Sequence, residues 1–85
     1  MKLISDTRFE KQYKKLPDKI KKKFIQRVGI LVTDGRNPSL RVHTLAGNKY
    51  PMKSMNVTGD YRALFIVEKN TITFYNIGTH SELYQ

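Results

Sequence analysis

The feature that most constrains the fold is a change of pattern at Gly35. Before Gly35 the apolar residues recur every three or four positions, which is the period of an amphipathic helix. After Gly35 short apolar stretches alternate with Gly, Asn and Asp turns, a pattern typical of strands joined by hairpins. A chain of 85 residues has room for one hydrophobic core. The sequence therefore predicts a single domain over residues 1–85, with helices and most strands in separate halves.

The first half predicts a hairpin of two helices. Thr7 and Glu10 have the spacing of a capping box, and we expect the first helix to run from there to about Leu16. Pro17 cannot continue that helix but suits the first turn of another. We expect the second helix to run to about Asp34. Each helix has one apolar face, so the lysines lie mainly on the outside of the hairpin.

The other predicted elements are strands. One short strand precedes the helices, and three or four follow them, separated by tight turns; the expected ranges are 2–5, 41–45, 53–57, 61–67 and 71–77. Residues 80–85 are expected to form a short terminal turn or helix. Consecutive strands with short turns pair antiparallel. The predicted fold class is α+β, in the order β-α-α-β-β-β, with the helical hairpin packed on one face of a small antiparallel sheet.

The net charge indicates the kind of partner. Sixteen Lys and Arg face seven Asp and Glu, which gives +9, and ten of the cations fall within the first 27 residues. A field of this sign attracts polyanions such as RNA, DNA, anionic lipid or an acidic protein segment. The longest apolar run, residues 63–67, is too short for a membrane span or a signal peptide, so we expect no membrane partner. The absence of cysteine excludes disulfides and favours a cytoplasmic protein.

The two histidines are the first candidates for chemistry. Imidazole serves as both acid and base near neutral pH, and an antiparallel meander can bring His43 and His80 together although 37 residues separate them. The sheet face left uncovered by the helices is the expected place for a site. Two histidines and scattered carboxylates show no metal-ligand spacing, so we expect neither a metal nor another cofactor.

Three segments, residues 43–48, 57–65 and 77–84, resemble the RelE/ParE superfamily of toxins, and most closely its YafQ-type branch of mRNA interferases. The likeness covers nearly the whole chain, since the element order and the lysine-rich helices are also those of the family. The resemblance implies a RelE-like fold and the toxin of a type II toxin–antitoxin system. It further implies a ribosome-dependent endoribonuclease that inhibits translation by cleaving mRNA through metal-free attack of the 2′-hydroxyl.

The same resemblance implies five catalytic residues. His43 and His80 match histidines that serve in acid–base chemistry. Asp60 matches the acidic residue of the turn before an aromatic residue, and Arg62 matches an arginine that contacts the scissile phosphate. Tyr84 matches an aromatic residue that stacks on a nucleobase or assists proton transfer.

Substrate binding is assigned in the same way. Tyr61 offers a ring for an unpaired base, and Lys49 and Lys53 supply cations as lysines do in RelE-type members. Asn56 departs from the pattern, because the YafQ-type branch tends to have another histidine there. The division of acid and base roles therefore stays open.

The implied partners are a cognate acidic antitoxin, the ribosome with its rRNA, and mRNA, and the toxin–antitoxin complex is expected to bind operator DNA. Two other functions remain open. A ParE-like DNA gyrase inhibitor shares the fold but has no need of both histidines. A non-catalytic basic nucleic-acid-binding module would tolerate His80→Gln and Arg62→Lys with little loss. The Asn56 departure also leaves open a toxin that no longer cleaves.

Overall fold

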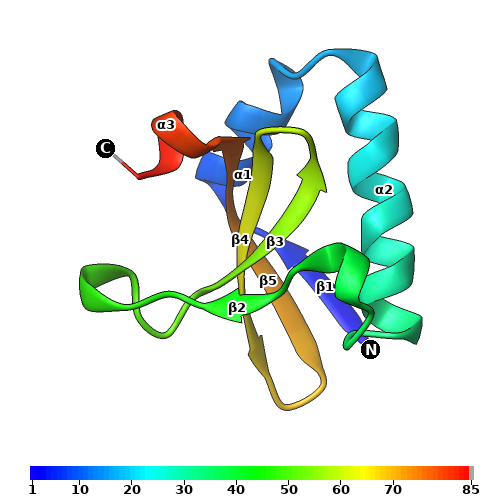
Figure 1. Cartoon of the computed structure of the whole chain (residues 1–85), viewed down its shortest axis with the longest axis vertical. Coiled ribbons are helices and arrows are strands. Elements are labelled where there is room, and N and C mark those ends of the chain that lie inside the picture. The colour runs from blue at the N-terminus through cyan, green and yellow to red at the C-terminus, as the bar shows by residue number, and fades with distance from the viewer. Residues whose placement is uncertain (85) are drawn as a thin grey trace.

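A five-stranded sheet in the order β1-β5-β4-β3-β2 carries the fold (Figure 1). The computed structural model describes residues 1–84. Its elements in chain order are β1 (Lys2–Ser5), α1 (Thr7–Lys14), α2 (Asp18–Thr33), β2 (His43–Thr44), β3 (Lys53–Thr58), β4 (Tyr61–Glu68), β5 (Thr71–Thr79) and α3 (His80–Leu83), with single 3₁₀ turns at Pro38–Leu40 and Gly47–Lys49. The predicted α+β class is confirmed.

The sheet is mixed, which differs from the antiparallel sheet expected. Strands β2 to β5 pair antiparallel in sequence order, as their short turns require. Strand β1 instead lies parallel to β5, with Leu3 opposite Ile72. Turn chemistry governs only strands that are neighbours in sequence. The pairing of β1 with β5 depends on how the long intervening chain returns, so local patterns do not specify it.

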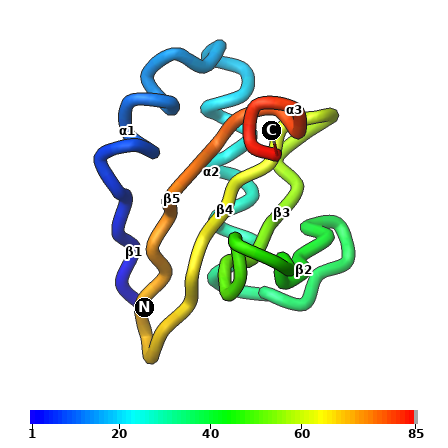
Figure 2. The backbone as a smooth tube through the Cα atoms, turned by 90° about the vertical axis from the view of Figure 1, so that its left-hand side faces the viewer, coloured from blue at the N-terminus to red at the C-terminus, as the bar shows by residue number. Residues whose placement is uncertain are grey.

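The helical hairpin covers one face of the sheet. In Figures 1 and 2, α2 lies on the side of the sheet opposite to α3 and the β2–β3 connection. Between the helices and the sheet is an aromatic cluster, in which the Phe24 ring centroid lies 5.3 Å from Phe9 and 5.2 Å from Phe74. Phe65 extends this cluster into the central strand β4, 5.9 Å from Phe74. Such pairs contribute about 0.5–1.5 kcal/mol each beyond burial alone, so they fix the helices on this face.

The capping box predicted at Thr7 and Glu10 is wrong. Asp6 is the N-cap of α1, without a side-chain cap, and Thr7 is the first helical residue. The reason is that the Asp6 backbone N–H still donates to Phe74 O, at 2.9 Å, so the helix starts directly after the last sheet bond. Glu10 instead accepts a hydrogen bond from Ser5 Oγ, at 3.0 Å.

Several element ends also differ from the predicted ones. Helix α1 ends at Lys14 rather than Leu16, because the next two backbone N–H groups turn to the carbonyls three residues back. Strand β2 is shorter than the predicted 41–45, since Arg41 has a left-handed backbone with φ of 49° and ends the preceding 3₁₀ turn. The predicted turn between β3 and β4 is present, with Gly59 at φ of 52°. No helix within residues 1–84 is long and apolar enough to cross a membrane.

Candidate active site

The sheet face opposite the helical hairpin carries most of the predicted site residues. Side chains alternate along β3, so Met55 and Val57 enter the main core while Ser54 and Asn56 lie on the opposite face. Helix α3 and the β2–β3 connection flank this face (Figure 2). The polar residues of β3 therefore lie on the uncovered face, where the sequence predicts a site.

Tyr84 is the centre of this group. Its ring centroid lies 4.5 Å from that of His80, and its hydroxyl donates to Ser54 Oγ at 3.2 Å. The Lys49 Nζ lies 5.9 Å from the Tyr84 ring centroid, within the range of a cation–π contact. Ser54 is fully buried and lies directly across the ladder from His43. Tyr84 and Ser54 therefore link the two histidines across one sheet face.

The two histidines are both exposed but are held differently. His43 Nδ1 lies 3.0 Å from the Arg41 carbonyl oxygen. A carbonyl oxygen only accepts, so Nδ1 carries the hydrogen and Nε2 of the neutral ring keeps a free lone pair. His80 is the first residue of α3, and its backbone N–H donates to Asp60 O at 3.1 Å. The imidazole of His80 packs against the Tyr84 ring and has no hydrogen-bond partner within residues 1–84.

Arg62 is fixed by the turn that precedes it. Its Nη1 donates to Asn56 Oδ1 at 2.8 Å, Gly59 O at 2.9 Å and Tyr61 O at 3.1 Å. All three contacts use Nη1, so among residues 1–84 the hydrogens of Nε and Nη2 remain for a ligand. Arg62 pairs across the ladder with Gly78, two residues before His80. The guanidinium is therefore held beside the start of α3.

Three predicted residues lie elsewhere. Tyr61 shares its strand face with Ala63, packs partly against the main core and lines a cleft next to α1. Lys53 lies opposite Thr44, with its Nζ 3.3 Å from Thr44 Oγ1, and so projects to the other side of the β2–β3 ladder from His43. Asp60 lies in the exposed turn after Thr58 and contributes its carbonyl, rather than its carboxylate, to the bond with His80.

Two residues of this face were missed from the sequence. Ser54 holds Tyr84, and Asn56 holds Arg62. The signal for both was present in the period-two pattern of β3, where polar Ser54 and Asn56 alternate with Met55 and Val57. The sequence identifies Asn56 only as a departure from a family pattern, whereas in the structure Asn56 positions the guanidinium of Arg62.

A hollow next to Tyr84 gives the face room for a ligand. It has a volume of about 290 Å³ and is lined by Leu45, Ala46, Asn48, Lys49 and Tyr84. An aromatic ring and a cation at its wall suit an unpaired base with its phosphate. Within residues 1–84 no three His, Asp or Glu side chains gather in a way that would hold a metal ion.

The helical hairpin and the mixed sheet form a fold that this chain shares with solved structures of toxins. Three solved structures show the likeness over nearly the whole chain. YafQ from Escherichia coli BL21(DE3) is 16% identical, with 98% of this chain and 97% of that one covered and a TM-score of 0.85. The YafQ of the E. coli DinJ–YafQ toxin–antitoxin complex is 17% identical over 98% and 96%, with a TM-score of 0.81.

The third structure is the YoeB/ParE toxin from Agrobacterium tumefaciens, which is 14% identical over 94% of this chain and 99% of that one, with a TM-score of 0.80. No protein-family model matches the sequence, and no curated protein is a significant match. The resemblance to the RelE/ParE toxins is thus confirmed in the fold, while the identities are too low to transfer an activity.

Proposed function

We propose that this protein is the toxin of a toxin–antitoxin pair and an endoribonuclease that cleaves mRNA on the ribosome. The observation that carries the proposal is the contact of Tyr84 with both His80 and Ser54, where Ser54 lies across the ladder from His43 and Arg62 lies across the ladder from Gly78, shortly before α3. It supplies two imidazoles, a guanidinium and a stacking ring on one open surface. Those groups meet the needs of metal-free RNA cleavage.

In the proposed reaction the 2′-hydroxyl of the substrate attacks the adjacent phosphorus, and the bond from phosphorus to the 5′-oxygen breaks. His43 Nε2 takes the proton of the 2′-hydroxyl, because the Arg41 carbonyl keeps the hydrogen of the neutral ring on Nδ1. His80 donates a proton to the departing 5′-oxygen. The products are a 2′,3′-cyclic phosphate and a 5′-hydroxyl. Each proton transfer contributes on the order of 10²–10⁴ in rate.

Arg62 stabilises the charge that develops on the phosphate. Its Nη1 is already occupied by Asn56 and the turn carbonyls, which hold the guanidinium plane in place before substrate binds. The Nε and Nη2 donors then form a two-pronged contact with the phosphate oxygens, which a lysine cannot reproduce. Tyr84 and Lys49 hold the neighbouring base and its phosphate.

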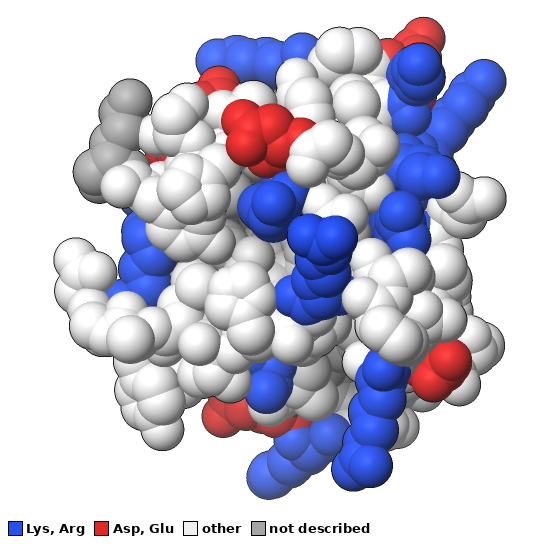
Figure 3. All heavy atoms as spheres, in the orientation of Figure 1, with Lys and Arg blue, Asp and Glu red and all other residues white. Residues whose placement is uncertain are grey.

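Ribosome dependence follows from the need for positioning. A site with two exposed histidines gains from a partner that holds the message in line, since positioning contributes about 7–11 kcal/mol in favourable cases. The sixteen Lys and Arg side chains provide cations that can bind rRNA phosphates. On the face drawn in Figure 3, Lys and Arg are more frequent than Asp and Glu. The same positive charge suits binding to an acidic antitoxin, and we place both proteins in the cytoplasm. The toxin–antitoxin complex would bind operator DNA.

The experiment is a cleavage assay with purified protein, translating ribosomes and a defined message, read by primer extension. Wild-type protein is expected to cut the translated message, leaving 5′-hydroxyl ends. His80→Ala is expected to lower the rate by roughly 10²–10⁴, and Arg62→Lys to lower it although the charge is kept. Gln26→Ala, an exposed change on α2, is the matched control and should cut normally. Intact messages together with inhibited DNA gyrase would overturn the proposal in favour of the ParE-like function.

A further inference from the structure

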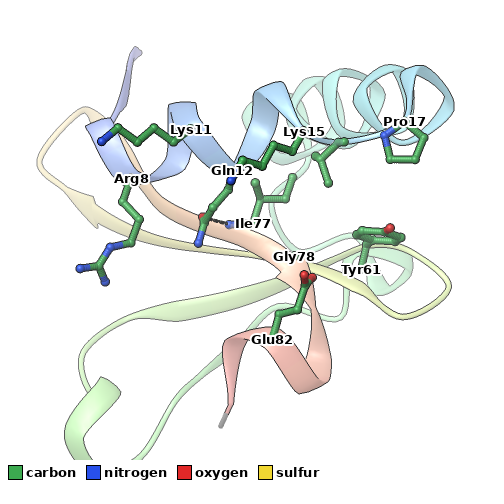
Figure 4. Close-up of a pocket in the computed structure, with 10 residues that line it drawn as sticks. Arg8, Lys11, Gln12, Lys15, Pro17, Tyr61, Ile77, Gly78 and Glu82 are labelled. Atoms are coloured by element: carbon green, nitrogen blue, oxygen red, sulfur yellow. Dashed lines mark hydrogen bonds between the residues drawn. The ribbon is translucent and has the colours of Figure 1, made fainter.

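A cleft between α1 and α3 shares no lining residue with the hollow beside Tyr84. It has a volume of about 490 Å³ and lies between α1, the ends of β4 and β5, and α3. Figure 4 shows Arg8 at one end of this cleft, Tyr61 at the other, and the Glu82 side chain extending from α3 toward α1. The cleft is therefore elongated, with cations along one wall and an aromatic ring at one end.

The α1 wall is cationic along its length. Arg8, Lys11 and Lys15, here called the α1 cations, are exposed and all line the cleft. Arg8 and Lys11 lie in α1 and Lys15 is its C-cap residue, still with a helical backbone, so the spacing of three and four residues places them on one face. Seven residues cover about 10 Å of helix axis at roughly 1.5 Å per residue. In duplex DNA each strand presents a phosphate about every 3.4 Å of helix axis, and a single strand is more extended, so the wall is long enough for a short run of phosphates.

The opposite walls suit a base. Tyr61 presents a partly exposed ring that the core holds from behind, and such a ring stacks bases with little sequence preference. Glu82 faces the same space, and both of its hydrogen bonds to Thr79 use Oε1. Its Oε2 has no hydrogen-bond partner within residues 1–84 and is able to accept from an amino or imino group of a base.

We propose that this cleft is a second contact site for single-stranded RNA. Phosphates lie along the α1 cations, and one unpaired base stacks on Tyr61 beside Glu82. The site is separate from the face that carries His43 and Tyr84, so it binds RNA without cleaving it. The choice of RNA over an acidic polypeptide as the ligand rests on the proposed function. The Tyr61 ring gives a second reason for RNA, because such a ring stacks on a base.

The test measures equilibrium binding of a fluorescent 2′-O-methyl tetranucleotide, which has no 2′-hydroxyl and cannot be cleaved. The variant R8Q/K11Q/K15Q removes the α1 cations. Its matched control, K14Q/K22Q/R36Q, removes the same residue types from exposed positions outside the cleft. We expect at least about tenfold weaker binding for the cleft variant, and a salt slope smaller by about two, at roughly 0.7 per phosphate contact. The control should lose no more than about threefold.

The base contact is tested separately. Tyr61→Leu is expected to weaken binding about tenfold, and Tyr61→Phe, which keeps the ring, to restore it. Thermal unfolding of both variants shows whether Tyr61→Leu is less stable. If it is, the NMR amide shifts of Lys11 and Gly78 on addition of the tetranucleotide still report whether the cleft binds it.

Equal losses in the two triple variants, or unchanged binding in Tyr61→Leu, would overturn this site. So would a cleft variant that binds the tetranucleotide normally but no longer binds poly-glutamate, since the cleft would then be a site for an acidic protein. The assay involves neither ribosomes nor cleavage. Failure of the proposed cleavage function would leave these binding results unchanged.

Discussion

The hydrogen bond between Tyr84 and Ser54 should be measurable as a coupling energy. Ser54 is fully buried, and its Oγ accepts from the Tyr84 hydroxyl at 3.2 Å. Tyr84→Phe keeps the ring beside His80 but leaves a buried hydroxyl without this partner, which costs about 1–3 kcal/mol. Ser54→Ala removes the buried group itself and leaves a partly exposed phenol that water reaches, so it should cost about 0.5–1 kcal/mol.

The double variant shows whether the two residues stabilise the fold through one shared hydrogen bond or independently of each other. Once both hydroxyls are absent no buried polar group is left unpaired, so S54A/Y84F is expected to lie within about 0.5 kcal/mol of Ser54→Ala alone. The coupling energy should then be close to the cost of Tyr84→Phe alone, about 1–3 kcal/mol, measured by thermal unfolding of all four proteins. For a domain of this size 1 kcal/mol moves the Tm by about 4–8 °C. Losses that add to within about 0.3 kcal/mol would refute the reasoning.

Three further predictions concern the neighbouring contacts. Asn56→Ala should lower cleavage by about tenfold with little change in Tm, because Arg62 loses the 2.8 Å contact to Asn56 that orients it; a cleavage rate equal to wild type would contradict this role. Gly78→Ala should destabilise α3, since an added Cβ would lie 2.9 Å from Glu82 Oε1, and amide exchange in α3 would report it. Hydrogen bonds from Thr79 lower the pKa of Glu82 below its ordinary value of 4.5. The stabilisation is therefore present above pH 4.5 and lost as the pH falls through the folded pKa, which an NMR titration of α3 amides should show in wild type but not in Glu82→Gln.

Capping signals show how far local sequence reasoning reaches. The same Thr-x-x-Glu spacing occurs at Thr7–Glu10 and at Thr79–Glu82. At the first position it predicts a box that does not form, because Asp6 is still bonded to the sheet when the helix begins. At the second position both reciprocal bonds are present and start α3. Spacing identifies the chemistry of a cap, but sheet pairing decides which residue takes the cap position.

Strand alternation predicts more about the site than the motif match alone. Neighbouring residues on a strand face opposite sides, so Tyr61 and Arg62 do not serve one pocket from adjacent positions in β4. Tyr61 has the parity of the core residues Ala63 and Phe65, and the structure places it with them. The antiparallel order of β2 to β5 and the turn at Gly59 were likewise readable from the sequence, since both depend on neighbouring residues.

The convergence of the two histidines depends on register, which local patterns do not determine. His43 reaches the Tyr84 side of the sheet only because it pairs with Ser54. A shift of one residue in that pairing would turn His43 toward the other face and place it opposite a core position. The pairing of β4 with β5 contains an actual register shift, between Leu64 and Phe65, on the strand pair that leads to His80. The proposed site therefore rests on two registers. The β4–β5 register is supported by core residues on the far face of the sheet, among them Ala63 and Ile77, whereas both residues of β2 are exposed.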